Sequence, residues 1–197
     1  MGRWNIRWSI LLVLWCVTGV KLAAMKVESL DRGWFFNRGY ESQAADKVTV
    51  DLPHTWNAAD AMFGNVNYYR GMSTYSRFIV VPSSENFKRV FLRVKAAQTV
   101  ADVYLDNHFV AQHKGGYTSF TVELTHLIRR GEKQKLDIRV SNAQTMEIAP
   151  ICGDFNIWGG LNRGVELLYT DDACIDPTFY GSSGVFFTQY NVSEKYA

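Results

Sequence analysis

Short runs in which hydrophobic and polar residues alternate make up much of the chain after residue 46. Alternation with a period of two turns successive side chains to opposite faces, so each run predicts a half-buried β-strand. The predicted strands are 47–52, 73–81, 89–96, 100–105, 108–113, 119–124, 135–140 and 164–169. No segment keeps the period of an amphipathic helix, and the pattern therefore predicts an all-β chain.

Turn-forming residues separate the predicted strands. Asp106 and Asn107 connect the runs 100–105 and 108–113, and both side chains tolerate positive φ, which predicts a tight hairpin. Seven or eight short strands with one apolar face each need a second sheet to cover that face. The pattern therefore predicts an antiparallel β-sandwich.

The first 24 residues differ from the rest of the chain. Two arginines precede an almost unbroken apolar run at 9–20, and small residues follow at 23–24. This order is typical of a secretory signal peptide over 1–24, with cleavage near Ala24. An uncleaved membrane anchor and a true start at Met25 are the alternatives, although the apolar run is short for a membrane span.

A cleaved signal peptide would place the mature protein in the periplasm or outside the cell, without a stable membrane span. Lipid attachment at Cys16 is not indicated, because the bulky Trp15 precedes it where a small residue is expected. Cleavage would remove three of 21 basic residues and leave 18 against 19 acidic residues, a net charge of about −1. A near-neutral chain without a basic cluster does not indicate nucleic-acid binding.

Cysteine and histidine positions indicate neither a metal site nor a cofactor. Cys152 and Cys174 would remain after cleavage, and they fit either a disulfide formed in an oxidising compartment or two separate buried residues. No Cys-x-x-Cys or clustered His-Cys spacing occurs. The histidines are scattered among strands and turns, which favours structural or surface roles.

Two long loops, 57–69 and 141–162, interrupt the strands and are rich in Asn, Gly and aromatic residues. Long loops on a rigid sandwich are a common place for binding residues. The second loop ends in the stretch 154–167, which brings together a carboxylate, two aromatic rings, a Gly-Gly pair and an arginine. These groups can accept hydrogen bonds from hydroxyls and stack on a sugar ring, so the stretch indicates a carbohydrate site.

An ordered series of motifs carries a family resemblance. The motifs are 33–36 (GWFF), 51–57 (DLPHTWN), 68–71 (YYRG), 101–107 (ADVYLDN), 115–120 (GGYTSF), 154–155 (DF) and 159–163 (GGLNR). Together they resemble the N-terminal sugar-binding domain of glycoside hydrolase family 2, which includes β-galactosidases, β-glucuronidases and β-mannosidases. The resemblance covers 27–172 and implies a jelly-roll, galactose-binding-like sandwich beside a catalytic barrel. Residues 173–197 resemble a connector towards an immunoglobulin-like domain that this sequence does not contain.

The resemblance also assigns candidate site residues. Asp154 matches an aspartate that reaches a substrate hydroxyl in the family's β-galactosidases, and capping of its own loop is the alternative role. Asn67 lies in the loop where the family places another polar substrate contact. Trp158 could stack on a sugar ring, although burial, as also expected for Trp56, is the more ordinary role of a large aromatic side chain.

The loop around these residues departs from the family pattern at two positions. Where family members have an aromatic residue and an acid on either side of the loop arginine, this chain has Asn162 and Gly164. Arg163 is expected to fix the loop through carboxylate or carbonyl bonds, together with the flexible pair Gly159 and Gly160, and to be held differently from its family counterpart.

No catalytic residue is predicted in this chain. Retaining glycoside hydrolysis needs two carboxyl groups about 5 Å apart, and the family places both in its barrel. The sequence therefore predicts a sugar-binding domain of a β-glycosidase, in a truncated or fragmentary chain, with a β-linked glycoside and a barrel encoded downstream as partners. A stand-alone carbohydrate-binding module and a structural sandwich for protein contacts are the alternatives.

Overall fold

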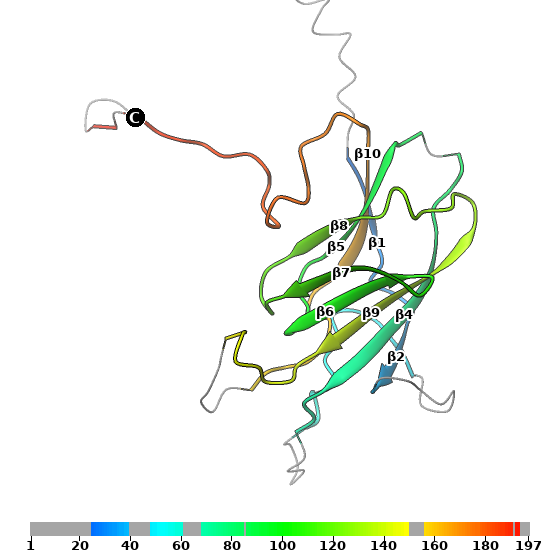
Figure 1. The fold of residues 1–197 in the computed structure, drawn as a ribbon, viewed down its shortest axis with the longest axis vertical. Helices are drawn as coiled ribbons and strands as arrows, with labels where there is room; N and C mark the ends of the chain where they lie inside the picture. The colour runs from blue at the N-terminus through cyan, green and yellow to red at the C-terminus, as the bar shows by residue number, and fades with distance from the viewer. Residues whose placement is uncertain are drawn as a thin grey trace, which may run out of the picture.

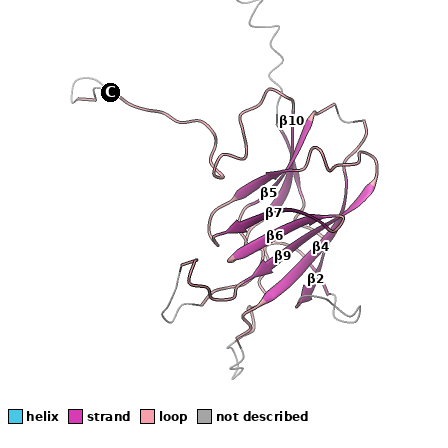
Figure 2. Ribbon diagram, viewed as in Figure 1, coloured by secondary structure: helices cyan, strands magenta, loops and turns pink. Residues whose placement is uncertain are grey.

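The structure is a computed structural model that describes residues 25–39, 48–60, 68–84, 86–149, 156–190 and 192–193 (Figure 1). The expected signal peptide, Asp154, Asn67 and Cys152 lie outside the described residues. The described part contains strands and loops without helices, as Figure 2 shows. It therefore holds no helix that is long and apolar enough to cross a membrane.

Ten strands form two antiparallel sheets in the described residues. The smaller sheet has the order β1-β10-β5-β8, with β1 at Lys26–Ser29, β10 at Val165–Thr170, β5 at Arg89–Val94 and β8 at Phe120–Glu123. The larger sheet has the order β3-β2-β4-β9-β6-β7. Its strands are β3 at Val48–Val50, β2 at Trp34–Arg38, β4 at Met72–Val80, β9 at Lys133–Ser141, β6 at Val100–Leu105 and β7 at His108–Lys114.

The eight strands expected from the alternating pattern are all present, with ends shifted by a few residues. The expected hairpin is confirmed, because β6 pairs with β7 and the intervening Asp106 and Asn107 have φ values of 49° and 68°. The structure adds β1 and β2, which the pattern did not predict. β2 begins with three consecutive aromatic residues and therefore does not alternate, while β1 has only four residues and a mostly exposed surface.

The core lies between the two sheets and follows the alternation of the strands. The larger sheet contributes Tyr75 from β4 and Ile138 from β9, both fully buried, and the smaller sheet contributes Leu92 and Leu167. Trp34 is also fully buried and donates its indole N–H to the carbonyl oxygen of Leu30 at 2.6 Å. The inward face of each strand thus covers the other sheet, as expected for a sandwich.

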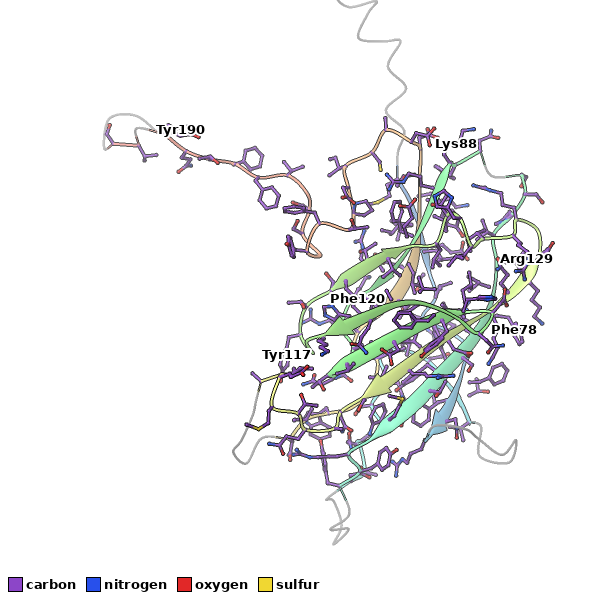
Figure 3. The ribbon with its side chains drawn as sticks, viewed as in Figure 1. Phe78, Lys88, Tyr117, Phe120, Arg129 and Tyr190 are labelled. Carbon is purple, nitrogen blue, oxygen red and sulfur yellow. The ribbon has the colours of Figure 1, made fainter. Side chains whose placement is uncertain are left out.

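The two ends of the sandwich carry different loops. The connections after β3, β5 and β7 and the loop before β10 meet at one end, while the β6–β7 hairpin and the start of β9 lie at the other. In Figure 3, Tyr117 marks the first end, and Arg129 lies at the opposite end. Chain segments far apart in the sequence are therefore brought together at the end that includes Tyr117.

Candidate functional site

Two buried asparagines support the loop that precedes β10. Asn57 and Asn142 are fully buried. The Asn57 Oδ1 atom accepts hydrogen bonds from the Gly159 backbone N–H at 2.8 Å and from the Asn142 side-chain amide at 3.1 Å. The same Asn142 amide donates to the carbonyl oxygen of Ile157 at 2.9 Å. Because buried polar groups are costly without partners, these bonds fix the path of the loop.

The Gly159-Gly160 pair allows this loop to approach the 53–57 segment closely. A Cβ atom on Gly159 would lie 2.0 Å from the indole ring of Trp56. Gly160 has φ of +136°, and a Cβ atom there would lie 2.3 Å from the carbonyl oxygen of His54. No other residue type fits either position without displacing backbone or a buried ring, which gives a physical reason for the glycine pair.

Backbone hydrogen bonds then join three segments at this end of the sandwich. The His54 N–H donates to Leu161 at 2.9 Å, and the Gln98 N–H donates to Gly160 at 3.0 Å. The Thr55 hydroxyl adds a bond of 2.8 Å to the Gly159 carbonyl oxygen. The backbones of these segments are therefore held in a fixed relative arrangement.

These segments surround an open hollow of about 520 Å³. Its volume lies within the range of small-molecule sites, about 300 to 1,000 Å³. Two of its aromatic residues are exposed, Tyr117 by 66% and Trp158 by 41% of their surface. The lining consists of Pro53, His54, Thr55, Ala96, Gln98, Gly116, Tyr117, Trp158, Asn162 and Arg163.

His54 is a neutral polar group in this lining. Its Nδ1 atom lies 2.7 Å from the hydroxyl oxygen of Tyr75. Burial raises the pKa of Tyr75, although a backbone hydrogen bond from Leu161 acts in the opposite direction, so the phenol keeps its proton. Burial also lowers the pKa of His54, so the ring is neutral near pH 7 and offers one N–H donor and one nitrogen acceptor.

Asn162 and Arg163 have different roles. The Asn162 amide nitrogen donates to the Trp158 carbonyl oxygen at 2.8 Å and to Gln98 Oε1 at 3.3 Å, so this side chain braces the loop. Its Oδ1 atom is buried and has no partner among the described residues. Arg163 is exposed and forms no hydrogen bond or ion pair with another described residue.

Sequence-predicted site residues are only partly brought together. Trp158, Gly159, Gly160 and Arg163 lie in one loop, and Trp158 and Arg163 line the hollow. Burial is confirmed for Trp56, which is 5% exposed, whereas Trp158 is not buried within the sandwich. The expected bonds from Arg163 are absent among the described residues, and Asn57, Asn142 and Asn162 hold the loop instead.

Sequence reasoning assigned no site role to several residues of the lining, among them His54, Gln98 and Tyr117. His54 and Tyr117 occur in the quoted motifs, but no site role was assigned to them. Gln98 lies in the short connection between the predicted strands 89–96 and 100–105. Because this connection is short, its residues stay close to the ends of the two strands, where the hollow lies. The short length of this connection is the sequence signal that could have placed Gln98 near the site.

The lining offers no acid pair and no metal site among the described residues. It contains no Asp or Glu. Glu166, which follows the loop, is 7% exposed and pairs with Arg93 at 3.1 Å and Lys95 at 2.8 Å. The described residues also contain no group of His, Cys, Asp and Glu side chains that could hold a metal ion.

Comparisons with known proteins agree with this geometry. The sequence profile of the family described as "Glycosyl hydrolases family 2, sugar binding domain" matches residues 27–171. A β-glucuronidase of Bacteroides fragilis is 40% identical over 85% of this chain and 24% of its own length. A β-galactosidase of Thermoanaerobacter pseudethanolicus is 30% identical over 66% of this chain and 18% of its own length.

A solved structure shares the fold. A calcium-binding mutant of Bacteroides uniformis β-glucuronidase 2 superposes with a TM-score of 0.78 at 32% identity, over 87% of this chain and 21% of that protein. The chain therefore spans about a quarter or less of the length of these relatives.

Proposed function

Since the chain belongs to the sugar-binding domains of glycosyl hydrolase family 2, we propose that it holds a β-linked sugar at the Tyr117 end of its sandwich, as part of a β-glycosidase. The acid and the nucleophile of hydrolysis, about 5 Å apart in retaining enzymes, would come from a catalytic barrel beside this domain. The role of this domain is to bind and orient the sugar.

The hollow carries this proposal. Trp158 exposes 41% of its surface although the loop beneath it is fixed by buried amides. Exposing a rigid aromatic ring to water has an energetic cost that stacking on the C–H face of a sugar would recover. Around the ring, the Gln98 amide and the neutral His54 provide hydrogen-bonding groups for sugar hydroxyls.

Asp154 and Asn67 complete the proposal as substrate-binding residues. Both belong to loops whose described ends lie at the same end of the sandwich, next to β4 and β10. There a carboxylate would accept hydrogen bonds from sugar hydroxyls that the hollow leaves free, and an amide would both accept and donate them. We further propose that the protein acts in the periplasm or outside the cell, on the basis of the signal-like pattern in 1–24.

Titration of the full chain with methyl β-D-glucoside and methyl β-D-galactoside tests this function. We expect NMR chemical-shift changes to concentrate on residues of the hollow, and Trp158→Ala to weaken binding by about fivefold or more, since a stacked ring contributes about 1 kcal/mol or more. Phe187→Ala, which removes a more exposed aromatic side chain outside the hollow, should leave binding unchanged. Shift changes spread over other surfaces would refute the proposal.

The purified chain should not hydrolyse nitrophenyl β-glycosides by itself. The reaction needs paired carboxyl groups, and the described lining of the hollow contains none. The measurement is release of nitrophenol over several hours at high protein concentration. Turnover that survives repurification and disappears in Asp154→Asn would show that this chain carries catalytic groups of its own.

A further inference from the structure

A second pocket lies beside β8, apart from the hollow that carries the proposed function. Its volume is about 620 Å³, which is within the range of small-molecule sites. His113 of β7 and residues 118–121 form one wall, and residues between 176 and 181 form the other. The two cavities share no described lining residue, since Tyr117 belongs to the hollow and Phe120 to the second pocket (Figure 3). The second pocket can therefore take a ligand of its own.

Close contacts join the two walls of the second pocket. Gly181 has φ of +64°, and a Cβ atom there would lie 2.2 Å from the Ser119 carbonyl oxygen. The Ser119 hydroxyl also donates a hydrogen bond of 3.2 Å to the Gly181 carbonyl oxygen. A side chain at position 181 would push the walls apart, so this glycine sets the width of the pocket.

Asp176 gives the second pocket a negative charge. Its Oδ1 atom accepts hydrogen bonds from the Thr178 hydroxyl at 2.7 Å and from the Thr178 backbone N–H at 2.8 Å. These bonds lower the pKa of Asp176, so the carboxyl group is ionised at neutral pH. Its Oδ2 atom forms no hydrogen bond or ion pair with a described residue. This oxygen is therefore available to a ligand.

No cation in the described lining of the second pocket balances this charge. Burial lowers the pKa of His113, although a backbone hydrogen bond to Gly115 acts in the opposite direction, so the ring is neutral near pH 7. Arg89 lies close enough to act on Asp176 electrostatically, but it is not part of the lining. Its guanidinium group donates two hydrogen bonds to Glu123, at 3.0 and 2.8 Å. A ligand therefore meets an unbalanced carboxylate.

Two aromatic rings lie in the same wall as Asp176. Phe179 is 47% exposed and Tyr180 is 89% exposed, and both line the second pocket. Their centroids are 5.0 Å apart and their planes are nearly perpendicular, at 82°. Perpendicular rings form a corner, and the electron-rich faces of such rings attract a cation. The carboxylate and the rings thus favour the same kind of ligand.

The opposite wall contributes a hydroxyl group that the fold does not use. Thr121 is 9% exposed and lines the second pocket. Its Oγ1 atom is buried and has no hydrogen-bond partner among the described residues. Buried hydroxyls without a partner are uncommon in folded proteins. A ligand with several N–H donors would match a wall of this kind.

We propose that the second pocket binds a primary ammonium group carried on a short apolar stem, with Asp176 pairing with the charge and the rings of Phe179 and Tyr180 covering the stem. This inference goes beyond sugar binding and does not depend on it. Asp176 would repel an anion. A neutral ligand would displace water from the carboxylate without supplying a counter-charge. A primary ammonium group supplies both the charge and three N–H donors.

Two probes that differ only in their polar group test the inference. n-Butylammonium carries a positive charge where 1-butanol carries a hydroxyl group, and NMR titration of the full chain near pH 7 gives both affinities. We expect n-butylammonium to bind about tenfold more tightly at low salt, because the ion pair and the cation–π contact add to the same apolar contact. Shift changes should concentrate on residues 118–121 and 176–181.

Variants assign the preference to the second pocket. Asp176→Asn removes the charge but keeps an oxygen that can accept the Thr178 bonds, so it should abolish the preference without unfolding the chain. Asp172→Asn is the matched control, because Asp172 is an exposed acid of the same segment outside the lining. Phe179→Leu should weaken n-butylammonium binding about threefold, whereas the matched Phe187→Leu should have no effect.

The outcomes decide the proposal independently of the sugar titration. Loss of the preference in Asp176→Asn, with wild-type behaviour in Asp172→Asn, supports the ammonium site. Equal affinity of the wild-type chain for both probes would overturn it. A preference that persists in Asp176→Asn, or that Asp172→Asn reduces by the same factor, would also overturn it, since the charge of this pocket would then not be the cause. None of these results changes the expected binding of sugars at the hollow.

Discussion

The loop at 156–164 and the C-terminal segment at 173–190 flank the same strand, β10, but they are held in different ways. Buried amides of Asn57 and Asn142 and several backbone bonds fix the loop. The C-terminal segment leaves the sandwich in Figure 1 after contacts that include a bond of 3.2 Å from Ser119 to the Gly181 carbonyl oxygen, close packing of Gly181 on the Ser119 backbone, and a contact of 3.6 Å between Arg89 and Cys174.

The apolar side chains of the two regions also differ in how far they are buried. Beneath the loop, Trp56 and Leu161 are buried, whereas the C-terminal segment exposes Ile175, Phe179, Tyr180, Val185, Phe186, Phe187 and Tyr190. In Figure 3, Tyr190 lies well away from the strands. The loop is thus specified by contacts inside this domain. The segment instead leaves most of its large apolar side chains exposed.

Substitution of one glycine with positive φ in each region should give the largest difference in the free energy of unfolding. Gly160→Ala should lower the free energy of unfolding by about 3 kcal/mol or more, because its Cβ atom would meet the His54 backbone at 2.3 Å. Gly184→Ala should cost about 1 to 2 kcal/mol, since its Cβ atom would meet the Cγ2 methyl of the exposed Ile175 at 2.6 Å and the Asp176 carbonyl oxygen only at 3.2 Å. Urea denaturation of both variants measures this, and equal costs would contradict the comparison.

Removing a buried amide should lower the free energy of unfolding nearly as much as Gly160→Ala does. Asn57→Ala removes the acceptor for Gly159 N–H and for the Asn142 amide, and should cost about 2 to 3 kcal/mol of unfolding free energy. Thr178→Ala removes an exposed bond of 2.7 Å to Asp176 in the C-terminal segment. It should change stability by less than about 0.5 kcal/mol, and a larger change would show that the segment is integral to the fold.

The strands and the loop differ in how far the sequence predicts them. Alternation predicted eight strands and the Asp106-Asn107 hairpin, because both depend on local spacing. It did not predict the Asn57–Asn142 contact, since the two residues are 85 positions apart and only the folded sandwich brings them together. The role of Arg163 depended on partners that the sequence could not place, and the structure leaves this arginine without one among the described residues.

Lowering the pH should weaken the ion pair between Arg89 and Glu123, which lies beside the C-terminal segment. Arg89, which contacts Cys174, also forms two bonds with Glu123, at 3.0 and 2.8 Å, and these lower the pKa of Glu123 to about 2. A carboxyl group with a lowered pKa in the folded state stabilises the fold above its ordinary pKa of about 4.3. That stabilisation is lost as the pH falls towards the folded-state value.

The measurement is the unfolding free energy of the wild-type chain and of Glu123→Gln from pH 6 to pH 2. The side chains of the pair are 29% and 32% exposed, so solvent screening limits the expected gap at pH 6 to about 1 kcal/mol. The gap should close near pH 2. Burial lowers the pKa of His54 in both proteins, so its protonation cancels in the difference. A gap that is independent of pH would exclude the ion pair as its source.

The exposed aromatic residues of the C-terminal segment should have the smallest effect on stability. Phe187 is 92% exposed, and Phe187→Ser should change the free energy of unfolding by less than about 0.5 kcal/mol. The matched change Phe36→Ser, at a residue that is 6% exposed in the core, should cost about 3 kcal/mol or more. Sedimentation at increasing concentration should show less self-association for Phe187→Ser, because an uncovered apolar surface promotes contact between copies. If Phe187→Ser instead lowered stability by more than about 1 kcal/mol, the segment would be packed against this domain, and the contrast with the loop would not hold.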